Sequence, residues 1–265
     1  MSAWMKPVDR QPETGFRRAL YAYRVGMKWL SFLIFGLGTL FLALAALPAL
    51  RLLLHPKERF QRLARRMLFY SMRFFVWIMR FLRVVEVRVE DRAAYAGLHS
   101  KILVANHPSL LDVVILISLV PNADCIVNAK LLRNIVSGVI RHLYIPNSVE
   151  FDRLLRLCDQ SLKHGNCLII FPEGTRTPRR GKAGIKKGAA RLALFSGCGV
   201  APVHIGGTDK YGLGKGDPWT GFNPADKYVY SLRMLEEISP RKYAGLPEAA
   251  AARRLTGDIK DALGL

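Results

Sequence analysis

The chain has 265 residues, of which 40 are lysine or arginine and 20 are aspartate or glutamate, so its formal net charge at pH 7 is +20. Such an excess of positive charge indicates a polyanionic partner, which is nucleic acid, an anionic membrane or a phosphate-bearing substrate. Hydrophobic residues make up 51% of the chain. Membrane attachment explains both facts, whereas a soluble nucleic-acid binder does not need so much apolar content.

The N-terminal region contains an apolar stretch, residues 29–50, with 22 residues and no charge. A helix of that length can span a hydrocarbon core of about 30 Å. A signal peptide is the competing interpretation because Ala43-Leu44-Ala45 resembles a cleavage site, but a charged leader of 28 residues argues against it. Six basic residues precede the stretch and six follow it closely, so the positive-inside rule gives no clear topology. A re-entrant or half-buried hairpin with both ends in the cytoplasm would remove this conflict.

The next segment carries an arginine every seven residues, at Arg59, Arg66, Arg73 and Arg80. This spacing keeps the four cations on one face of a helix. The remaining positions are rich in aromatic and apolar residues. One interpretation is an amphipathic helix packed on the domain core, and the other is a membrane-surface helix. We favour the second, because aromatic surface beside a basic stripe suits an anionic headgroup layer.

From Val84 onward, short β-rich runs alternate with helical patterns. The expected strands are 84–90, 101–106, 124–129, 167–173, 199–205 and 227–235. The expected helices are 109–120, 130–142, 150–164, 185–196 and 247–263. Apolar strands separated by helices indicate an α/β fold with a mixed, mostly parallel sheet flanked by helices. The chain therefore divides into an N-terminal membrane-anchoring helical region, 1–83, and an α/β catalytic domain, 84–265.

The four cysteines are not expected to bind a metal. Cys125, Cys158, Cys167 and Cys198 lie in apolar or helix-like contexts and show no C-x-x-C spacing. Disulfide frameworks belong to small secreted domains, and zinc sites carry characteristic cysteine spacings. We expect reduced cysteines in a cytosolic domain, with no metal and no bound cofactor.

The segment NHPSLLD, residues 106–112, places a histidine and a carboxylate five residues apart where an expected strand gives way to an expected helix. One interpretation is a helix start, since Pro108 suits the first helical turn and Ser109 with Asp112 fits a capping box. The other is a catalytic dyad, in which the proline keeps His107 outside the helix and free to fold back towards Asp112. A carboxylate on one imidazole nitrogen fixes the tautomer and leaves the other nitrogen to accept a proton.

A second segment, FPEGTR (171–176), follows the apolar run CLII. A glutamate, a glycine, a hydroxyl and an arginine at a strand exit can orient a phosphate or a polar headgroup, although a plain surface turn is the alternative. Residues 176–191 carry seven basic side chains and no acidic one, which indicates a phosphate cradle. The glycine-rich loop 206–221 contains Pro218 and no helical pattern follows it, so we expect a flexible substrate-side or lid loop rather than a dinucleotide site.

In order and spacing, NHPSLLD, FPEGTR with the following IKKG, and the strand GVAPVHI resemble blocks of the glycerolipid acyltransferase family. The resemblance is to the lysophospholipid acyltransferases of the 1-acylglycerol-3-phosphate acyltransferase type and covers about residues 84–235. The apolar N-terminus before the H-x-x-x-x-D segment is also similar to that family. The resemblance implies transfer of a fatty acyl chain from acyl-CoA or acyl carrier protein to a lysolipid hydroxyl at the membrane surface.

By position, the resemblance implies that His107 is the general base and that Asp112 orients it and stabilises its charge. Pro202 matches the last family block, where it would shape the backbone near the acyl pocket. The implied acceptor and phosphate contacts are Glu173, Gly174, Thr175, Arg176, Lys130 and Lys187.

One position departs from the family pattern. Asn147 stands where the family usually carries an arginine. If that arginine grips the acceptor phosphate, the protein acts on an acceptor without one, such as a lyso-aminolipid or another hydroxyacyl product. Alternatively, Arg141 or Arg153 compensates.

Two further functions remain open, hydrolysis with water as the acceptor and non-catalytic binding of anionic lipid or nucleic acid through the basic face. Basic acceptor-side residues would have no purpose in a hydrolase, and the 176–191 run lacks the interleaved aromatic residues of a nucleic-acid site. We expect membrane lipids and acyl-CoA or acyl carrier protein as partners, and no nucleic acid. The expected location is the inner (cytoplasmic) membrane, with the catalytic domain on its cytoplasmic face.

Overall fold

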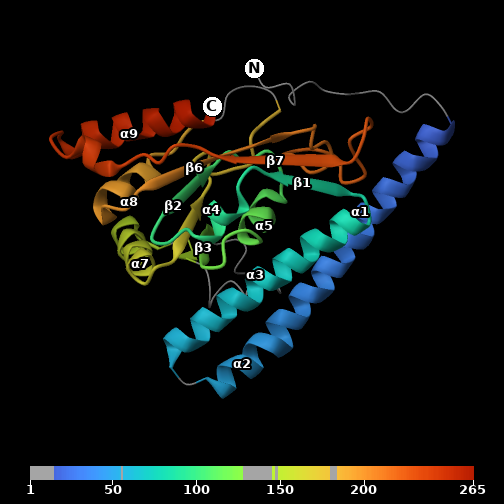
Figure 1. Ribbon diagram of the computed structural model, residues 1–265, viewed down its shortest axis with the longest axis horizontal. Helices are drawn as coiled ribbons and strands as arrows, with labels where there is room; N and C mark the ends of the chain where they lie inside the picture. The colour runs from blue at the N-terminus through green and yellow to red at the C-terminus, as the bar shows by residue number, and fades with distance from the viewer. Residues whose placement is uncertain (1–14, 55, 128–144, 147–148, 180–183) are drawn as a thin grey trace.

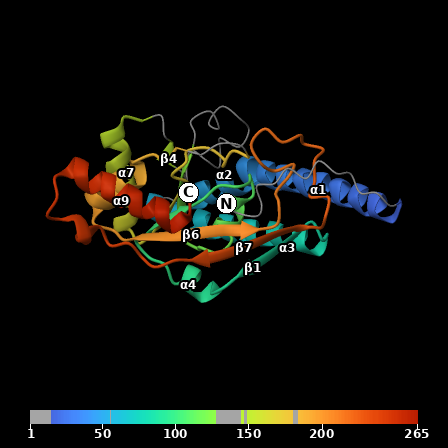
Figure 2. The same cartoon turned by 90° about the horizontal axis from the view of Figure 1, so that it is seen from above.

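Figure 1 shows the computed structural model of the chain, which describes residues 15–54, 56–127, 145–146, 149–179 and 184–265. The N-terminal part is a hairpin of long helices, and the rest is a sheet with helices on both faces (Figures 1 and 2). The expected helix 130–142 and the residues Lys130, Arg141 and Asn147 lie outside the described residues, so the predictions that concern them stay predictions.

In the described part of the chain, seven strands form one sheet in the order β1-β7-β6-β2-β5-β3-β4. In chain order they are β1 (Val85–Val89), β2 (Ile102–Ala105), β3 (Ala123–Val127), β4 (Ile145–Pro146), β5 (Cys167–Ile170), β6 (Val200–Gly207) and β7 (Tyr228–Met234). Neighbouring strands pair in parallel except β6 and β7, which are antiparallel. The predicted mixed, mostly parallel sheet is therefore confirmed. Because β2 and β5 are adjacent and parallel, the residues that follow them meet at one edge of the sheet.

Helices cover both faces of the sheet because successive strand residues point to opposite sides. Ile102 and Val104 pack with α7 (Phe151–Lys163), α8 (Gly188–Ser196) and α9 (Glu248–Leu263). Leu103 and Ala105 face the other way, into a core shared with α3 (Lys57–Phe81) and α5 (Asp112–Ile117). The described residues also contain two short helices, α4 (Arg92–Ala96) and the 3-10 helix η4 (Pro240–Tyr243).

The apolar N-terminal stretch forms one long helix in three sections, α1 (Gly15–Phe41), the π-helical η2 (Leu42–Ala46) and α2 (Leu47–Leu53). The wider π turn ends two residues before Pro48, whose ring and missing N–H disturb the preceding α-helical hydrogen bonds. The chain reverses at Pro56, and α3 runs back along α1 (Figure 1). Within the described residues, Gly15–Leu53 is the one helix long and apolar enough to cross a membrane. The expected long apolar N-terminal helix is thus present.

Helix α3 is an amphipathic core helix with an aromatic outer side. Leu68 and Phe75 are buried in the core that also contains β1 and α5 residues. Phe74, Trp77 and Phe81 are exposed and stack on one another, with ring centroids 5.8 and 5.7 Å apart. The interpretation of an amphipathic helix packed on the core is therefore confirmed, and contact of its outer side with a membrane stays a prediction.

The main difference from the expected elements lies at NHPSLLD. Helix α5 begins at Asp112, and residues 109–111 form a turn, so Pro108 and Ser109 precede the helix instead of starting it. The FPE residues of the expected strand 167–173 leave the sheet, since β5 ends at Ile170. Strand β4 was not expected, because two residues are too few to show an alternating pattern.

Candidate active site

The segment after β2 brings His107 and Asp112 together. Nδ1 of His107 lies 2.9 Å from Oδ2 of Asp112, and the aspartate side chain is fully buried while that of the histidine is 17% exposed. Asn106 fixes the strand exit, because its side chain donates to the Ile205 carbonyl at 2.9 Å and accepts from the Ile205 N–H at 2.7 Å. Within the described part of the chain, Nε2 of His107 makes no hydrogen bond. One imidazole nitrogen therefore faces a buried carboxylate, and the other is left for a substrate.

The Asp112 carboxylate is held by two further contacts. Its Oδ2 accepts from the Ser109 N–H at 2.7 Å, and its Oδ1 accepts from the Ser109 hydroxyl at 2.7 Å. The Ser109 hydroxyl in turn lies 2.8 Å from the Tyr230 hydroxyl on β7. The contact to the Ser109 N–H is the one that a capping box makes, so the helix-start and dyad interpretations describe the same carboxylate. Tyr230 was not expected from the sequence, since it lies 121 residues from Ser109.

The FPEGTR segment after β5 lies directly against the dyad. The Phe171 ring stacks on the His107 ring, with centroids 4.0 Å apart and an interplanar angle of 19°. Oε1 of Glu173 accepts from the His107 N–H at 3.0 Å and from the Thr177 hydroxyl at 2.7 Å. The Thr177 N–H donates to the His107 carbonyl at 2.7 Å. These contacts fasten the two strand exits to each other and hold the backbone of His107 in place.

Glu173 is buried, and its second oxygen, Oε2, has no hydrogen-bond partner among the described residues. Burial raises the pKa of this carboxyl, because removal from water disfavours the charged form. The observed contacts of Glu173 support the histidine loop. A direct contact with an acceptor stays a prediction.

The turn after Glu173 is open to the surroundings. Gly174 and Thr175 are exposed, and Gly174 has a φ of +66°, in the left-handed region that favours glycine. The Lys186 side chain lies over this turn, since a Cβ added to Gly174 would come within 2.6 Å of its Nζ. Lys187 is exposed and occupies the N-cap position of α8. Lys186 is therefore a cation beside the turn that the sequence analysis did not single out.

Arg176 connects the FPEGTR segment to the 206–221 loop. One of its guanidinium nitrogens, Nη1, donates to the carbonyls of Leu213 and Gly214, both at 2.9 Å. The Leu213 carbonyl also accepts from the Leu110 N–H, in the histidine segment, at 3.1 Å. The loop thus contacts both sequence motifs.

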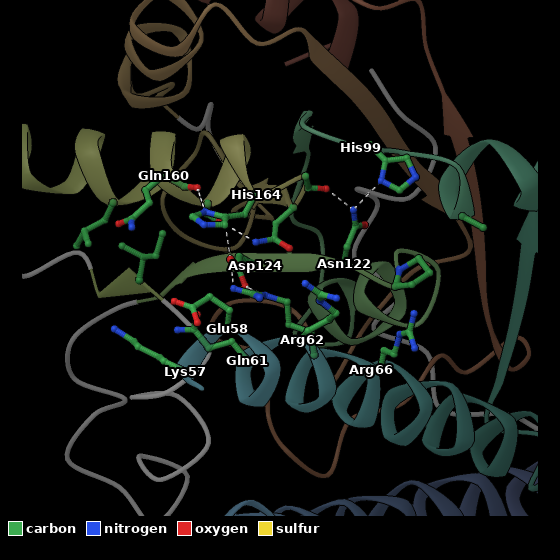
Figure 3. Close-up of a pocket in the computed structure, with 18 of the residues that line it drawn as sticks. Lys57, Glu58, Gln61, Arg62, Arg66, His99, Asn122, Asp124, Gln160 and His164 are labelled. Carbon is green, nitrogen blue, oxygen red and sulfur yellow. Dashed lines mark hydrogen bonds and ion pairs between the residues drawn. The ribbon is translucent and has the colours of Figure 1, made fainter. Parts of the chain in front are cut away.

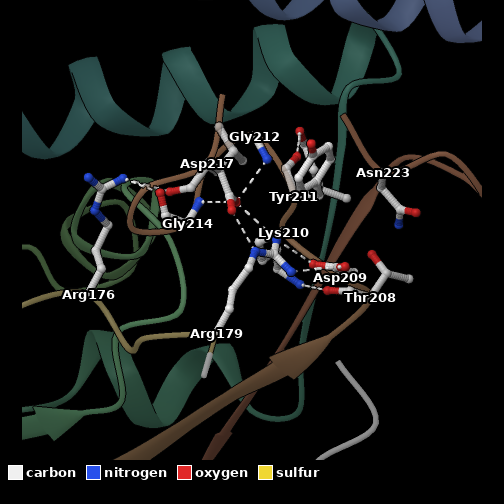
Figure 4. Close-up of polar contacts among 12 residues, drawn as sticks. Arg176, Arg179, Thr208, Asp209, Lys210, Tyr211, Gly212, Gly214, Asp217 and Asn223 are labelled. Atoms are coloured by element: carbon white, nitrogen blue, oxygen red, sulfur yellow. Dashed lines mark hydrogen bonds and ion pairs between the residues drawn. The ribbon is translucent and has the colours of Figure 1, made fainter. Parts of the chain in front are cut away.

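The 206–221 loop is anchored by a cluster of charges (Figure 4). Arg179 makes two hydrogen bonds to Asp217, at 2.6 and 2.9 Å, and two to Asp209, at 2.8 and 3.2 Å. Asp217 also accepts from the N–H groups of Gly212 and Gly214, at 3.0 and 2.9 Å. The loop therefore carries its own buried carboxylates and their partners, and its role as a flexible substrate-side or lid loop stays a prediction.

The contacts of the site suit proton transfer, and among the described residues none of the hydrogen bonds or ring contacts of His107 involves a cysteine. Cys158 lies on α7 and Cys167 begins β5, and burial raises the pKa of both thiols. Within the described ranges, no group of three or more histidine, cysteine or acidic side chains could hold a metal ion. His107 can instead take a proton on Nε2 while Asp112 stabilises the resulting imidazolium.

Comparison with known proteins relates the sheet domain to acyltransferases. Residues 87–206, which contain both sequence motifs, match the family model described as Acyltransferase. It is similar to LPAT1, a chloroplastic 1-acyl-sn-glycerol-3-phosphate acyltransferase of Arabidopsis thaliana, with 31% identity over 41% of this chain and 32% of that protein. The protein acl-2 of Caenorhabditis elegans, named for the same activity, is 31% identical over 38% of this chain and 39% of its own length. The chain spans about a third to two fifths of the length of these relatives.

A solved structure has the same fold. It is the crystal structure of PlsC, the 1-acyl-sn-glycerophosphate (LPA) acyltransferase from Thermotoga maritima. The TM-score is 0.62 at 24% sequence identity, and the match covers 94% of this chain and 96% of that chain. The described N-terminal helices and sheet therefore follow a known acyltransferase architecture.

Proposed function

We propose that this protein moves a fatty acyl chain from acyl-CoA or acyl carrier protein to the hydroxyl of a lysophospholipid, 1-acyl-glycerol-3-phosphate, at a membrane surface. The observation that carries the proposal is the position of His107, whose Nδ1 faces the buried Asp112 and whose Nε2 is left without a hydrogen bond in the described structure. The names of the relatives support the choice of acceptor.

The reaction follows from the dyad. Nε2 of His107 takes the proton of the acceptor hydroxyl while its oxygen attacks the thioester carbonyl carbon. The carbon–sulfur bond then breaks, and the departing sulfur receives the proton from the imidazolium. The products are a carboxylic ester and a free thiol, and the histidine returns to its neutral form. Asp112 stabilises the intermediate positive charge on His107 and fixes its tautomer.

The acceptor phosphate would lie beside the exposed turn of FPEGTR. Thr175 can donate a hydroxyl hydrogen bond there, and Lys186 and Lys187 supply positive charge next to it. Arg176 is half-buried and already donates to the 206–221 loop. Its contribution to phosphate binding would therefore come mainly from its positive charge and from its remaining nitrogens.

The membrane would be met by the helical hairpin. On the apolar helix, Leu33, Leu37, Phe41 and Leu44 are 58 to 69% exposed, a surface that costs free energy in water. The exposed rings of α3 add further apolar surface to the hairpin. We place the protein at the cytoplasmic membrane, with the sheet domain on the cytoplasmic side where acyl thioesters are available.

The proposal is tested by acyl transfer in detergent micelles, with a labelled acyl donor offered to lysophosphatidic acid and to a phosphate-free lysolipid. The His107→Ala variant should lose about 10²-fold or more of the wild-type rate. His204→Ala is the matched control. Successive side chains of β6 point to opposite faces of the sheet. Val203 packs in the core that contains α5, so the His204 side chain lies on the other face. Transfer to the phosphate-free acceptor alone would make position 147 the determinant of specificity. Transfer to neither acceptor, or transfer that does not need His107, would refute the proposal.

A further inference from the structure

A second polar site lies at the opposite end of the sheet from His107. It is a pocket of about 680 Å³ whose lining includes His99, Asn122 and Asn166. These residues come just before β2, β3 and β5, whereas the dyad and FPEGTR follow the carboxyl ends of β2 and β5. The three strands are parallel, and a strand of four residues is about 13 Å long. The pocket and the candidate active site therefore lie at opposite ends of these strands.

Two helices supply positive charge to this pocket (Figure 3). Lys57, Arg62 and Arg66 come from α3, and Arg153 comes from the first turn of α7. Arg62 and Arg66 are four residues apart on one helix, so their side chains lie on the same helix face. Among the described residues, these four cations have no hydrogen-bond or ion-pair partner. Arg153, which was considered as a substitute for an arginine at position 147, thus faces this pocket.

The acidic residue at the floor of the pocket is already neutralised. Asp124 is 2% exposed and accepts from Nε and Nη2 of Arg65 at 2.6 and 2.9 Å. The Ser161 hydroxyl also donates to it. Glu58 is the remaining acidic residue of the lining, against the four cations named above. A concave surface with such an excess of one sign attracts an oppositely charged ligand.

We propose that this pocket binds a phosphate group, independently of acyl transfer. Guanidinium groups suit a phosphate better than a small halide ion, because each can donate two parallel hydrogen bonds to phosphate oxygens. The volume lies in the usual range of small-molecule pockets, about 300 to 1,000 Å³. The ligand can be the headgroup of an anionic lipid or a water-soluble phosphate compound, since both present the same chemistry.

The position of the pocket favours a lipid headgroup over a water-soluble phosphate compound. Lys57 lies in the first turn of α3, directly after the hairpin turn. Leu52 and Leu53, on the other side of that turn, are 78 and 80% exposed. If this apolar end enters the membrane, the cations of the pocket stand at the level of the headgroups.

The test measures binding to full-length protein in neutral detergent by calorimetry. The probes are inorganic pyrophosphate, dihexanoyl phosphatidic acid below its micellar concentration, and dihexanoylglycerol, which has no phosphate. The double variant R62A/R66A is compared with R59A/R80A, which removes the same charge from exposed positions of the same helix outside the pocket. Phosphate binding near FPEGTR is common to both variants and cancels in the comparison.

We expect R62A/R66A to weaken binding of phosphatidic acid about 10- to 100-fold, as the loss of two charge-assisted contacts implies, and R59A/R80A to change it less than twofold. Both variants should keep the wild-type rate of any acyl transfer. Binding of phosphatidic acid at least about 10-fold tighter than pyrophosphate would support the lipid headgroup, and comparable affinities would support a soluble phosphate ligand. Equal weakening by both variants, equal binding of dihexanoylglycerol, or no binding of either phosphate at millimolar concentration would overturn the proposal.

Discussion

Replacing Asp112 by asparagine separates the charge of the dyad from its geometry. Oδ2 accepts from His107 and from the Ser109 N–H, while Oδ1 accepts from the Ser109 hydroxyl. In the variant, the amide oxygen can take the place of Oδ2 and keep both N–H donors. The amide nitrogen then faces the Ser109 hydroxyl, which can rotate to accept from it and donate to Tyr230. The hydrogen bonds and the histidine tautomer are therefore preserved, and what is lost is the negative charge.

The size of the effect follows from the buried contact. Two unit charges about 4 Å apart interact by about 4 kcal/mol at an effective dielectric constant of 20. A hydrogen bond to a charged group is worth about 1 kcal/mol more than a neutral one. We expect a barrier higher by about 2 to 4 kcal/mol, which lowers kcat about 30- to 10³-fold.

The assay compares kcat, KM and the thermal unfolding midpoint of wild type, Asp112→Asn and Asp112→Ala. The asparagine variant should lose kcat with KM and the unfolding midpoint nearly unchanged. The alanine variant should also lower the unfolding midpoint, because it leaves the buried Ser109 N–H without an acceptor. Asp159→Asn, at a surface ion pair of α7, is the control for the same chemical change. A wild-type kcat in Asp112→Asn would show that the charge is not used, and a large fall in its unfolding midpoint would refute the argument from hydrogen bonds.

Three further substitutions test the groups around the dyad. Arg179→Met removes the cation that pairs with the buried carboxylates of Asp209 and Asp217. Urea denaturation should show a free energy of unfolding lower by about 2 to 4 kcal/mol, a range that allows for the partial exposure of the arginine. A decrease below about 1 kcal/mol would contradict the anchoring role. Tyr230→Phe removes the hydroxyl that contacts the Ser109 hydroxyl and should lower kcat less than about 10-fold at unchanged KM. A change in KM alone would contradict a role of Tyr230 in supporting the dyad. Burial raises the pKa of Glu173, so the folded protein keeps this proton at pH values where the unfolded chain has released it. The contribution of Glu173 to the free energy of unfolding therefore falls as the pH rises above the usual carboxyl range. Glu173→Gln should remove that fall, so its stability relative to wild type increases with pH until Glu173 is ionised in the folded protein, and a pH-independent difference would exclude this explanation.

The dyad could be predicted because its signal is local. His107 precedes a proline, which keeps it out of the helical conformation, and the carboxylate follows within one turn. The position of the helix start could not be predicted. The pattern fits a capping serine at Ser109, but the structure uses Asp112 as the first helical residue and turns its side chain back to the Ser109 N–H. The same residues satisfy both arrangements, and only the contacts of the strand exit decide between them.

The supports of the site carry no local pattern. Tyr230 reaches Ser109 across 121 residues, and Arg179 reaches Asp217 across 38. Each pairing is decided by the order of strands in the sheet, which brings β7 and the loop before it beside β6. A glycine-rich loop with scattered charges therefore suggested flexibility, although its carboxylates are the points at which it is fixed.

Lys28 shows how closely the helical hairpin is connected to the site. In the sequence it is one of the cations before the apolar stretch, but its side chain is fully buried and its Nζ donates to the carbonyls of Trp219 and Gly221, at 2.6 and 2.5 Å. These residues end the loop that Arg176 holds from the other side. A buried ammonium is tolerated only with such acceptors, so α1 and the loop position one another.

The hairpin is consequently part of the folded core as well as the proposed membrane contact. Deleting residues 1–83 would remove Phe75 and the other buried side chains of α3 from the core, together with the contacts of Lys28. Loss of membrane binding by such a truncation would not distinguish a missing anchor from an unfolded domain. Substituting Phe74 and Trp77 by serine changes exposed rings instead, so weaker sedimentation with vesicles at an unchanged unfolding midpoint can be assigned to the membrane contact.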